Sequence, residues 1–130
     1  MDYCNIFINI RYSFASKEIP TIKVVGWLVK SGIRVVVYSG DQDANLPFIG
    51  TRRLVRKLAE ELKLKVTVDY TPWFVDGNLQ VGGWTEEYGK WLSYVVIMGA
   101  SHEAPATQPK RTFMLFDAFL QGKLLPIPQQ

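Results

Sequence analysis

Residues 33–39 read IRVVVYS, a run of mainly β-branched and apolar residues without polar alternation. Such a run is typical of a strand that is covered on both faces, as in the parallel sheet of an α/β protein. A similar run lies within WLSYVVIMGA at residues 91–100, where Val95 to Met98 are apolar. We therefore expect two buried strands in these stretches.

Three helices are expected around these strands. Apolar residues recur at helical spacing in residues 17–32, 51–63 and 110–122, and Gly32 is a suitable C-terminal stop for the first helix. The residues expected to face inward are, in chain order, Ile22, Val25, Leu28, Val29, Leu54, Val55, Leu58, Leu62, Phe113, Phe116 and Leu120.

Turn-forming residues separate the remaining segments. Asp76-Gly77-Asn78 lies between two stretches rich in strand formers and predicts a hairpin turn. Residues 40–51 and 101–109 are expected to be loops. The order helix, strand, helix, hairpin, strand, helix predicts an α/β fold with a mixed, mostly parallel sheet and flanking helices.

The composition fits one globular domain without a nucleic-acid-binding surface. The 130 residues are 48% hydrophobic and 21% charged, and the formal net charge is only +3. The densest basic stretch, residues 52–57, is followed at once by Glu60 and Glu61, as on a solvated helix face. No aromatic residues interleave with this basic stretch, so we expect no nucleic-acid partner.

The sequence carries no sign of a membrane span, and the first 14 residues do not resemble a signal peptide. Cys4 is the single cysteine, so no internal disulfide is possible. It is expected to be either a buried or idle thiol, or half of a bridge to another chain segment.

Acidic and imidazole side chains follow the two expected strands. Asp41 and Asp43 come directly after the first strand, and His102, the only histidine, follows the second. In open α/β sheets, chemistry is found in the loops beyond the carboxyl ends of the strands. A carboxylate there could orient the imidazole and stabilise its protonated form, which suits general acid–base catalysis.

The alternative is that His102 is an ordinary structural residue after a strand, and the chain offers no obvious nucleophile for it. No Gly-x-Ser-x-Gly elbow occurs in the 130 residues. Ser101 adjoins His102, but neighbouring side chains on an extended segment point to opposite sides. Nothing places the Cys4 thiol near the imidazole.

Three motifs in order resemble the serine carboxypeptidase-like family of the α/β-hydrolase superfamily, most closely its plant members. They are YSGDQDANLP at 38–47, VGGWTEEYG at 81–89 and GASHEAPATQP at 99–109. The resemblance runs from about Pro20 to Pro126. It implies that residues 1–130 form a single partial domain, the last third of the catalytic domain and thus the C-terminal portion of an α/β-hydrolase fold, incomplete without upstream strands.

The resemblance also implies roles for individual residues. The triad acid falls on Asp43 and the triad base on His102, while Asp41 becomes a loop-structuring residue. Glu103 follows the base and borders the leaving-group pocket, although it can equally be a solvated loop carboxylate. Cys4 resembles a family cysteine that pairs with one in the earlier part of the protein.

Some positions depart from the family pattern. Ala104 stands where valine is usual, and Asn45-Leu46 replaces a small residue followed by valine or isoleucine. Neither departure removes a triad group. The family's nucleophile elbow, oxyanion hole and carboxylate-binding residues lie upstream of the stretch that this sequence resembles.

The implied activity is serine-type hydrolysis of C-terminal peptide bonds, with Asp43 and His102 supplied by this chain. We expect the isolated chain to be inactive because it carries no nucleophile. The alternatives are a non-catalytic truncated or splice product, and part of an acyltransferase of the same family. No cofactor or metal is expected. The expected partners are a peptide substrate and the upstream catalytic segment, in the secretory pathway, the vacuole or outside the cell.

Overall fold

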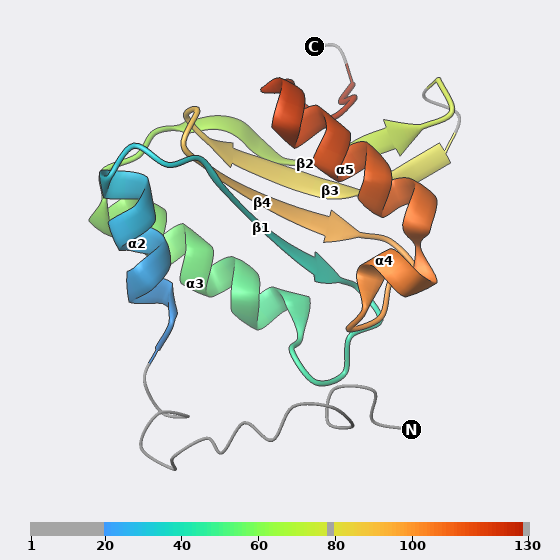
Figure 1. The fold of residues 1–130 in the computed structure, drawn as a ribbon, viewed down its shortest axis with the longest axis horizontal. Helices are drawn as coiled ribbons and strands as arrows, with labels where there is room; N and C mark the ends of the chain where they lie inside the picture. The colour runs from blue at the N-terminus through green and yellow to red at the C-terminus, as the bar shows by residue number, and fades with distance from the viewer. Residues whose placement is uncertain (1–19, 78–79, 129–130) are drawn as a thin grey trace.

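The computed structural model describes residues 20–77 and 80–128 (Figure 1). The helices are α2 (Ile22–Lys30), α3 (Phe48–Glu61), α4 (Ala104–Thr107) and α5 (Pro109–Gln121). The strands are β1 (Val35–Gly40), β2 (Val66–Val75), β3 (Gln80–Tyr88) and β4 (Leu92–Ile97). The expected order of helices, strands and hairpin is therefore confirmed.

The four described strands form one mixed sheet in the order β1-β4-β3-β2. β1 and β4 pair in parallel, from Val35 opposite Leu92 to Gly40 opposite Ile97. The pairs β4–β3 and β3–β2 are antiparallel. Because β1 and β4 run in the same direction and end in register, the loops that follow them leave from the same edge of the sheet.

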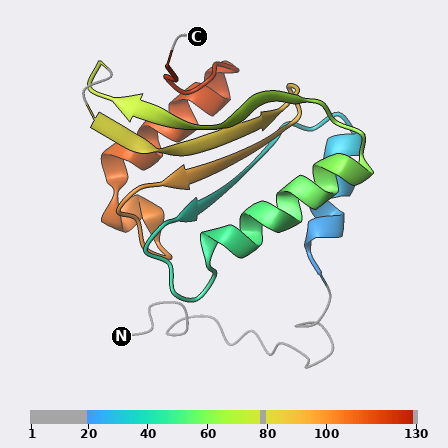
Figure 2. The same ribbon diagram turned by 180° about the vertical axis from the view of Figure 1, so that it is seen from behind.

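Helices cover both faces of the sheet, as Figures 1 and 2 show. One apolar core joins α2 and α3 to the sheet through Val29, Val55 and Leu58, and Tyr94 lies within it. A second core lies under α5, where Leu115 packs with residues of β2 and β4. Both β1 and β4 contribute side chains to both cores. This agrees with the continuous apolar runs in the sequence.

The hairpin expected at residues 76–78 joins β2 and β3. Asp76 and Gly77 have positive φ angles of 53° and 66°, as is common in hairpin turns, and Val75 pairs with Gln80, so four residues connect the two strands. Asn78, the third residue of the expected turn, lies outside the described residues. After α5 the chain runs back along β2, where the Phe74 N–H donates to the Pro126 carbonyl at 2.8 Å.

The expected bounds of several elements need correction. The first helix ends before Gly32, which has a φ angle of 78° as a C-terminal stop requires, but it begins at Ile22, so Pro20 precedes it. α3 begins at Phe48, inside the loop expected at 40–51. The loop expected at 101–109 contains the short helix α4, where alanine and an early proline favour a helical turn.

Two predictions of helix orientation were wrong. Leu54 of α3 is 52% exposed, and the buried residues of that helix are Val55, Leu58 and Ala59. In α5 the buried residues are Thr112 and Leu115. The three residues expected to face inward, Phe113, Phe116 and Leu120, are instead 70%, 38% and 76% exposed, and we call them the α5 apolar stripe.

The α5 apolar stripe continues onto the edge of the sheet. The Phe116 ring meets the Tyr38 ring of β1 edge to face, with 5.7 Å between the centroids. β1 is also the end strand of the sheet, and none of the described strands pairs with its outer edge. None of the described helices is long and apolar enough to span a membrane.

Candidate active site at the ends of β1 and β4

The loops that follow β1 and β4 bring Asp43 and His102 together. His102 Nδ1 lies 2.9 Å from Asp43 Oδ2, although the two residues are 59 positions apart. The Asp43 side chain is only 7% exposed, whereas the His102 side chain is 44% exposed. The hydrogen bond that the sequence predicts between a carboxylate and the imidazole is thus present, and one side of the ring remains open to solvent.

The Asp43 carboxylate is held by its own loop as well as by the imidazole. Its Oδ1 accepts hydrogen bonds from the backbone N–H groups of Asn45 at 2.9 Å and Leu46 at 3.1 Å. The hydrogen bond from His102, followed by that from the Leu46 N–H, lowers the pKa of Asp43 below its ordinary value of 3.8. The group is therefore ionised at neutral pH.

This contact fixes what the imidazole can do. An ionised carboxylate only accepts hydrogen bonds, so Nδ1 of His102 carries the proton in the pair. In the neutral ring, Nε2 is then the atom with a free lone pair. The arrangement can take a proton at Nε2 while Asp43 stabilises the imidazolium that forms.

The two loops approach each other closely beyond the last paired residues of the strands. The Gln42 N–H donates to the Ala100 carbonyl at 2.9 Å. A Cβ atom added to Gly40 would lie 2.2 Å from the same carbonyl oxygen and 2.5 Å from that of Ser101. Gly40 therefore permits a contact between the loops that no larger residue can make without moving them.

Asp41 has the expected loop-structuring role, but it joins the loop after β1 to the loop after β4. Its Oδ1 accepts a hydrogen bond from the Gly99 N–H at 2.7 Å, in the loop that precedes His102. The bonds within one loop that are common for aspartate in turns are made here by Asp43 instead. Gln108 also contacts Gly99, with Nε2 3.2 Å from its carbonyl oxygen. The prediction did not single out Gln108, although it lies in the quoted motif GASHEAPATQP.

None of the described serine hydroxyls bonds the His102 ring. The Ser101 hydroxyl lies 3.4 Å from Thr107 Oγ1, and the Ser101 N–H donates to the same atom at 3.0 Å. The Ser93 hydroxyl bonds Glu87. Cys4 lies outside the described residues. Both interpretations of its thiol, a buried or idle group and half of a bridge to another chain segment, therefore stay predictions.

Glu103 precedes α4 and is exposed. Its carbonyl oxygen accepts hydrogen bonds from Ala106 and Thr107, but its carboxylate does not cap the helix. Its suggested contact with substrate stays a prediction. Within residues 20–77 and 80–128, no group of three histidine, cysteine or acidic side chains is arranged to hold a metal ion.

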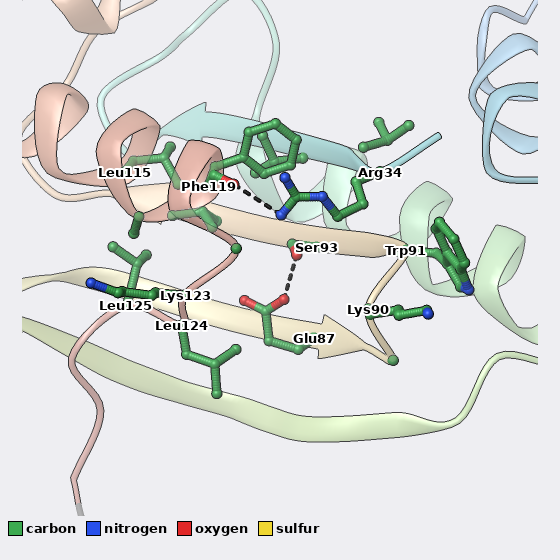
Figure 3. Close-up of a pocket in the computed structure, with 16 residues that line it drawn as sticks. Arg34, Glu87, Lys90, Trp91, Ser93, Leu115, Phe119, Lys123, Leu124 and Leu125 are labelled. Carbon is green, nitrogen blue, oxygen red and sulfur yellow. Dashed lines mark hydrogen bonds between the residues drawn. The ribbon is translucent and has the colours of Figure 1, made fainter. Parts of the chain in front are cut away.

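A separate cavity of about 340 Å³ lies between the sheet and the C-terminal half of α5 (Figure 3). Its lining includes Arg34, next to the start of β1, and Trp91, just before β4, so it is at the opposite end of these strands from His102. Glu87 projects into it and accepts hydrogen bonds from Ser93 and from Thr85, the latter at 2.8 Å. Burial raises the pKa of Glu87 above its ordinary value of 4.5.

Comparison with known proteins agrees with this geometry. A family model described as serine carboxypeptidase matches residues 2–122. Two Arabidopsis thaliana proteins, serine carboxypeptidase-like 46 and serine carboxypeptidase-like 45, are each 52% identical over 117 residues, which is 90% of this chain and 25% of each relative. Serine carboxypeptidase-like 41 of the same plant is 44% identical over 126 residues, or 97% of this chain and 24% of the relative.

The chain spans about a quarter of the length of the curated relatives that it matches. The match nevertheless covers nearly the whole chain, including β1, β4 and the loops that hold Asp43 and His102. The four-stranded mixed sheet with helices on both faces is consistent with part of an α/β-hydrolase fold. The chain therefore belongs to the serine carboxypeptidase family.

Proposed function

We propose that this chain supplies the general base and its orienting acid to the active centre of a serine carboxypeptidase. His102 is the base and Asp43 is the acid. The observation that carries this proposal is the 2.9 Å contact between Nδ1 of His102 and Oδ2 of Asp43, at the carboxyl ends of two paired parallel strands. Membership of the family supports the same roles.

In the proposed reaction, Nε2 of His102 takes the proton from a serine hydroxyl as that oxygen attacks the carbonyl carbon of the last peptide bond. Asp43 remains ionised and stabilises the imidazolium. The imidazolium then gives the proton to the departing amine, and an acyl-serine ester remains. A water molecule repeats the sequence: His102 takes its proton, hydroxide adds to the ester, and the serine leaves with the proton.

We further propose that the attacking serine belongs to polypeptide outside the 130 residues. None of the described serine hydroxyls forms a hydrogen bond with the imidazole. The outer edge of β1 is free among the described strands, and Tyr38 and the α5 apolar stripe lie beside it. A paired strand and a packed helix from an upstream segment would cover both features, and Cys4 could form a disulfide with that segment.

Two further parts of the proposal concern substrate and compartment. Glu103 is exposed next to the base, so its carboxylate could contact the leaving group of a peptide substrate. Family members that enter the secretory pathway suggest a vacuolar or extracellular location. On this proposal the isolated chain has no attacking oxygen and does not hydrolyse peptides.

The test uses a graft. The matching residues of a serine carboxypeptidase, whose hydrolysis of a blocked dipeptide is measured beforehand, are replaced by this chain. We expect the graft to retain activity and to react with a serine-directed fluorophosphonate. His102→Ala and Asp43→Asn should each lower kcat/KM by about 10⁴-fold, because each removes part of the proton-transfer pair.

The matched control is Asp117→Asn, which changes an exposed carboxylate of α5 that bonds only to Gln121 among the described residues. This variant should retain the activity of the graft. Near-normal turnover in the His102→Ala graft would contradict the assignment of the base. Fluorophosphonate labelling of the isolated 130-residue chain would contradict the proposed origin of the serine.

A further inference from the structure

Gly99, in the loop that carries His102, is hydrogen-bonded to a distant side chain through its N–H and to a second side chain through its carbonyl oxygen. The Gly99 N–H donates to Asp41 Oδ1 at 2.7 Å, and its carbonyl oxygen accepts from Gln108 Nε2 at 3.2 Å. Asp41 comes from the loop after β1, and Gln108 lies between α4 and α5. The loop after β1, the loop after β4 and the junction of α4 with α5 therefore meet at this glycine.

Glycine is required at this position for two reasons. Gly99 has a φ angle of 76°, in the left-handed region that other residues adopt only with strain. A Cβ atom there would also lie 2.8 Å from Gln108 Nε2, closer than a Cβ atom approaches a nitrogen, so the amide of Gln108 would have to move. The close approach of Gln108 thus depends on the missing side chain.

Arg111 fixes which end of the Gln108 amide faces Gly99. Its Nη1 donates to Gln108 Oε1 at 2.7 Å and to the Met98 carbonyl at 3.3 Å, and Nη2 donates to the Val81 carbonyl at 3.5 Å. A guanidinium has only donors, so it must face the amide oxygen. The amide nitrogen is then directed at the Gly99 carbonyl, and the network is anchored to β3 and to the end of β4.

The two hydrogen bonds to Gly99 lie beyond the last paired residues of β1 and β4, where strand pairing no longer sets the distance between the two loops. Strand pairing ends at Gly40 opposite Ile97, and Asp43 and His102 lie three and five residues farther along. Their hydrogen bond is 2.9 Å long and weakens rapidly beyond about 3.5 Å, so it tolerates a shift of only a few tenths of an ångström. Asp41 is two residues from the acid, and Gly99 is three residues from the base.

We propose that Asp41 and Gln108 are positioning residues for the Asp43–His102 pair and act through Gly99. Their catalytic importance rests on the proposed function, but the positioning itself does not. Asp41 ties the two loops together, and Gln108 prevents the Gly99 carbonyl from turning away. Neither residue touches the imidazole.

Positioning can be measured without any enzyme activity. His102 is the only histidine, so the Nδ1–H proton and the ring nitrogens of the ¹⁵N-labelled 130-residue chain give single, unambiguous NMR signals. In the unmodified chain we expect a downfield, slowly exchanging Nδ1–H signal from the bond to Asp43. Asp41→Ala should remove most of that signal, while amide dispersion and far-UV circular dichroism show that the chain stays folded.

Two conservative variants separate positioning from general stability. Asp41→Asn keeps an oxygen acceptor for the Gly99 N–H and should retain most of the signal. Gln108→Glu keeps an acceptor for Arg111 but loses the donor to the Gly99 carbonyl, so it should lose the signal. Asp117→Ala, which removes an exposed carboxylate of α5, is the control and should behave like the unmodified chain.

In the grafted enzyme, Asp41→Ala and Gln108→Glu should lower kcat by about 10- to 100-fold with little change in KM, since a misplacement of the base affects the chemical step. An unchanged Nδ1–H signal in Asp41→Ala would overturn the positioning role and leave the proposed function intact. An equal loss in Asp117→Ala would also overturn it. If the unmodified chain gave no such signal, the Asp43–His102 pair itself would fall, and the proposed function with it.

Discussion

Gly40→Ala should separate the two loops of the candidate site by adding one methyl group. Gly40 is the last residue of β1, and the added Cβ would lie 2.2 Å from the Ala100 carbonyl oxygen and 2.5 Å from the Ser101 carbonyl oxygen. Both neighbours are backbone atoms, which cannot rotate away as a flexible side chain can. The backbone of one loop or the other must therefore move.

The size of the movement follows from the contact distances. A carbon atom and a non-bonded oxygen settle at roughly 3.2 to 3.5 Å, so the loops must part by about 1 Å. If that shift reached the Asp43–His102 pair, the 2.9 Å bond between the two side chains would lengthen to about 3.9 Å, beyond hydrogen-bond range. Overpacking of this kind typically costs about 1–3 kcal/mol of stability.

The assay combines thermal unfolding, followed by circular dichroism, with the His102 Nδ1–H signal. For Gly40→Ala we expect Tm to fall by several degrees and the signal to disappear. Gly50→Ala is the matched control, because no atom lies within 4 Å of its added Cβ and the residue is in α3. That control should gain about 0.5–1 kcal/mol through helix propensity. An unchanged Tm and signal in Gly40→Ala would refute the reasoning.

Three other predictions concern stability, each measured by urea unfolding. The contribution of Asp43 to the free energy of unfolding should be present above pH 3.8 and lost as the pH falls through its lowered pKa. His102→Ala should flatten this dependence of stability on pH. An equal slope of stability against pH in that variant would count against the Asp43–His102 pair. Because Glu87 has a raised pKa, the unmodified chain should lose stability as the pH rises from 4.5 towards neutrality, and Glu87→Gln should not; parallel pH curves would contradict this. Leu115→Ala should cost about 2–5 kcal/mol and Leu120→Ala under about 1, because they are 2% and 76% exposed; similar costs would contradict the observed orientation of α5.

The sequence was sufficient to predict the strands and the meeting of a loop carboxylate with His102. Val35 to Val37 and Val95 to Ile97 form apolar runs that only a strand covered on both faces explains well. Once two such strands are parallel neighbours, the loops after them share one edge of the sheet. Counting residues beyond each run gives His102 and two carboxylates, Asp41 and Asp43, and only the family resemblance selected Asp43 as the partner of the imidazole.

The sequence was not sufficient to orient α5. Apolar residues lie on more than one side of this helix, so periodicity alone favoured the face with Phe113, Phe116 and Leu120 over the face with Leu115. The side of α5 that packs against the sheet is set by how its side chains fit there, and large apolar residues on the opposite side do not change this. The hydrogen bonds of Asp41 and Gln108 to Gly99 were missed for a related reason. A hydrogen bond between a side chain and a backbone group of another segment leaves no periodic pattern in the sequence.

The direction of β1 explains how a serine from another segment could reach His102. None of the described strands pairs with the outer edge of β1, and a strand that joined this edge in the parallel sense would end beside Gly40, where the Asp43 and His102 loops already lie. A serine in the turn after that strand would arrive at this edge, and Nε2 belongs to a ring that is 44% exposed there. The helix that follows such a strand has to pack on a face of the sheet, and among the described residues the α5 apolar stripe with Tyr38 is an exposed apolar surface beside that edge. The face of α5 that the sequence pattern assigned to the inside of this chain would then be buried against the segment that brings the nucleophile.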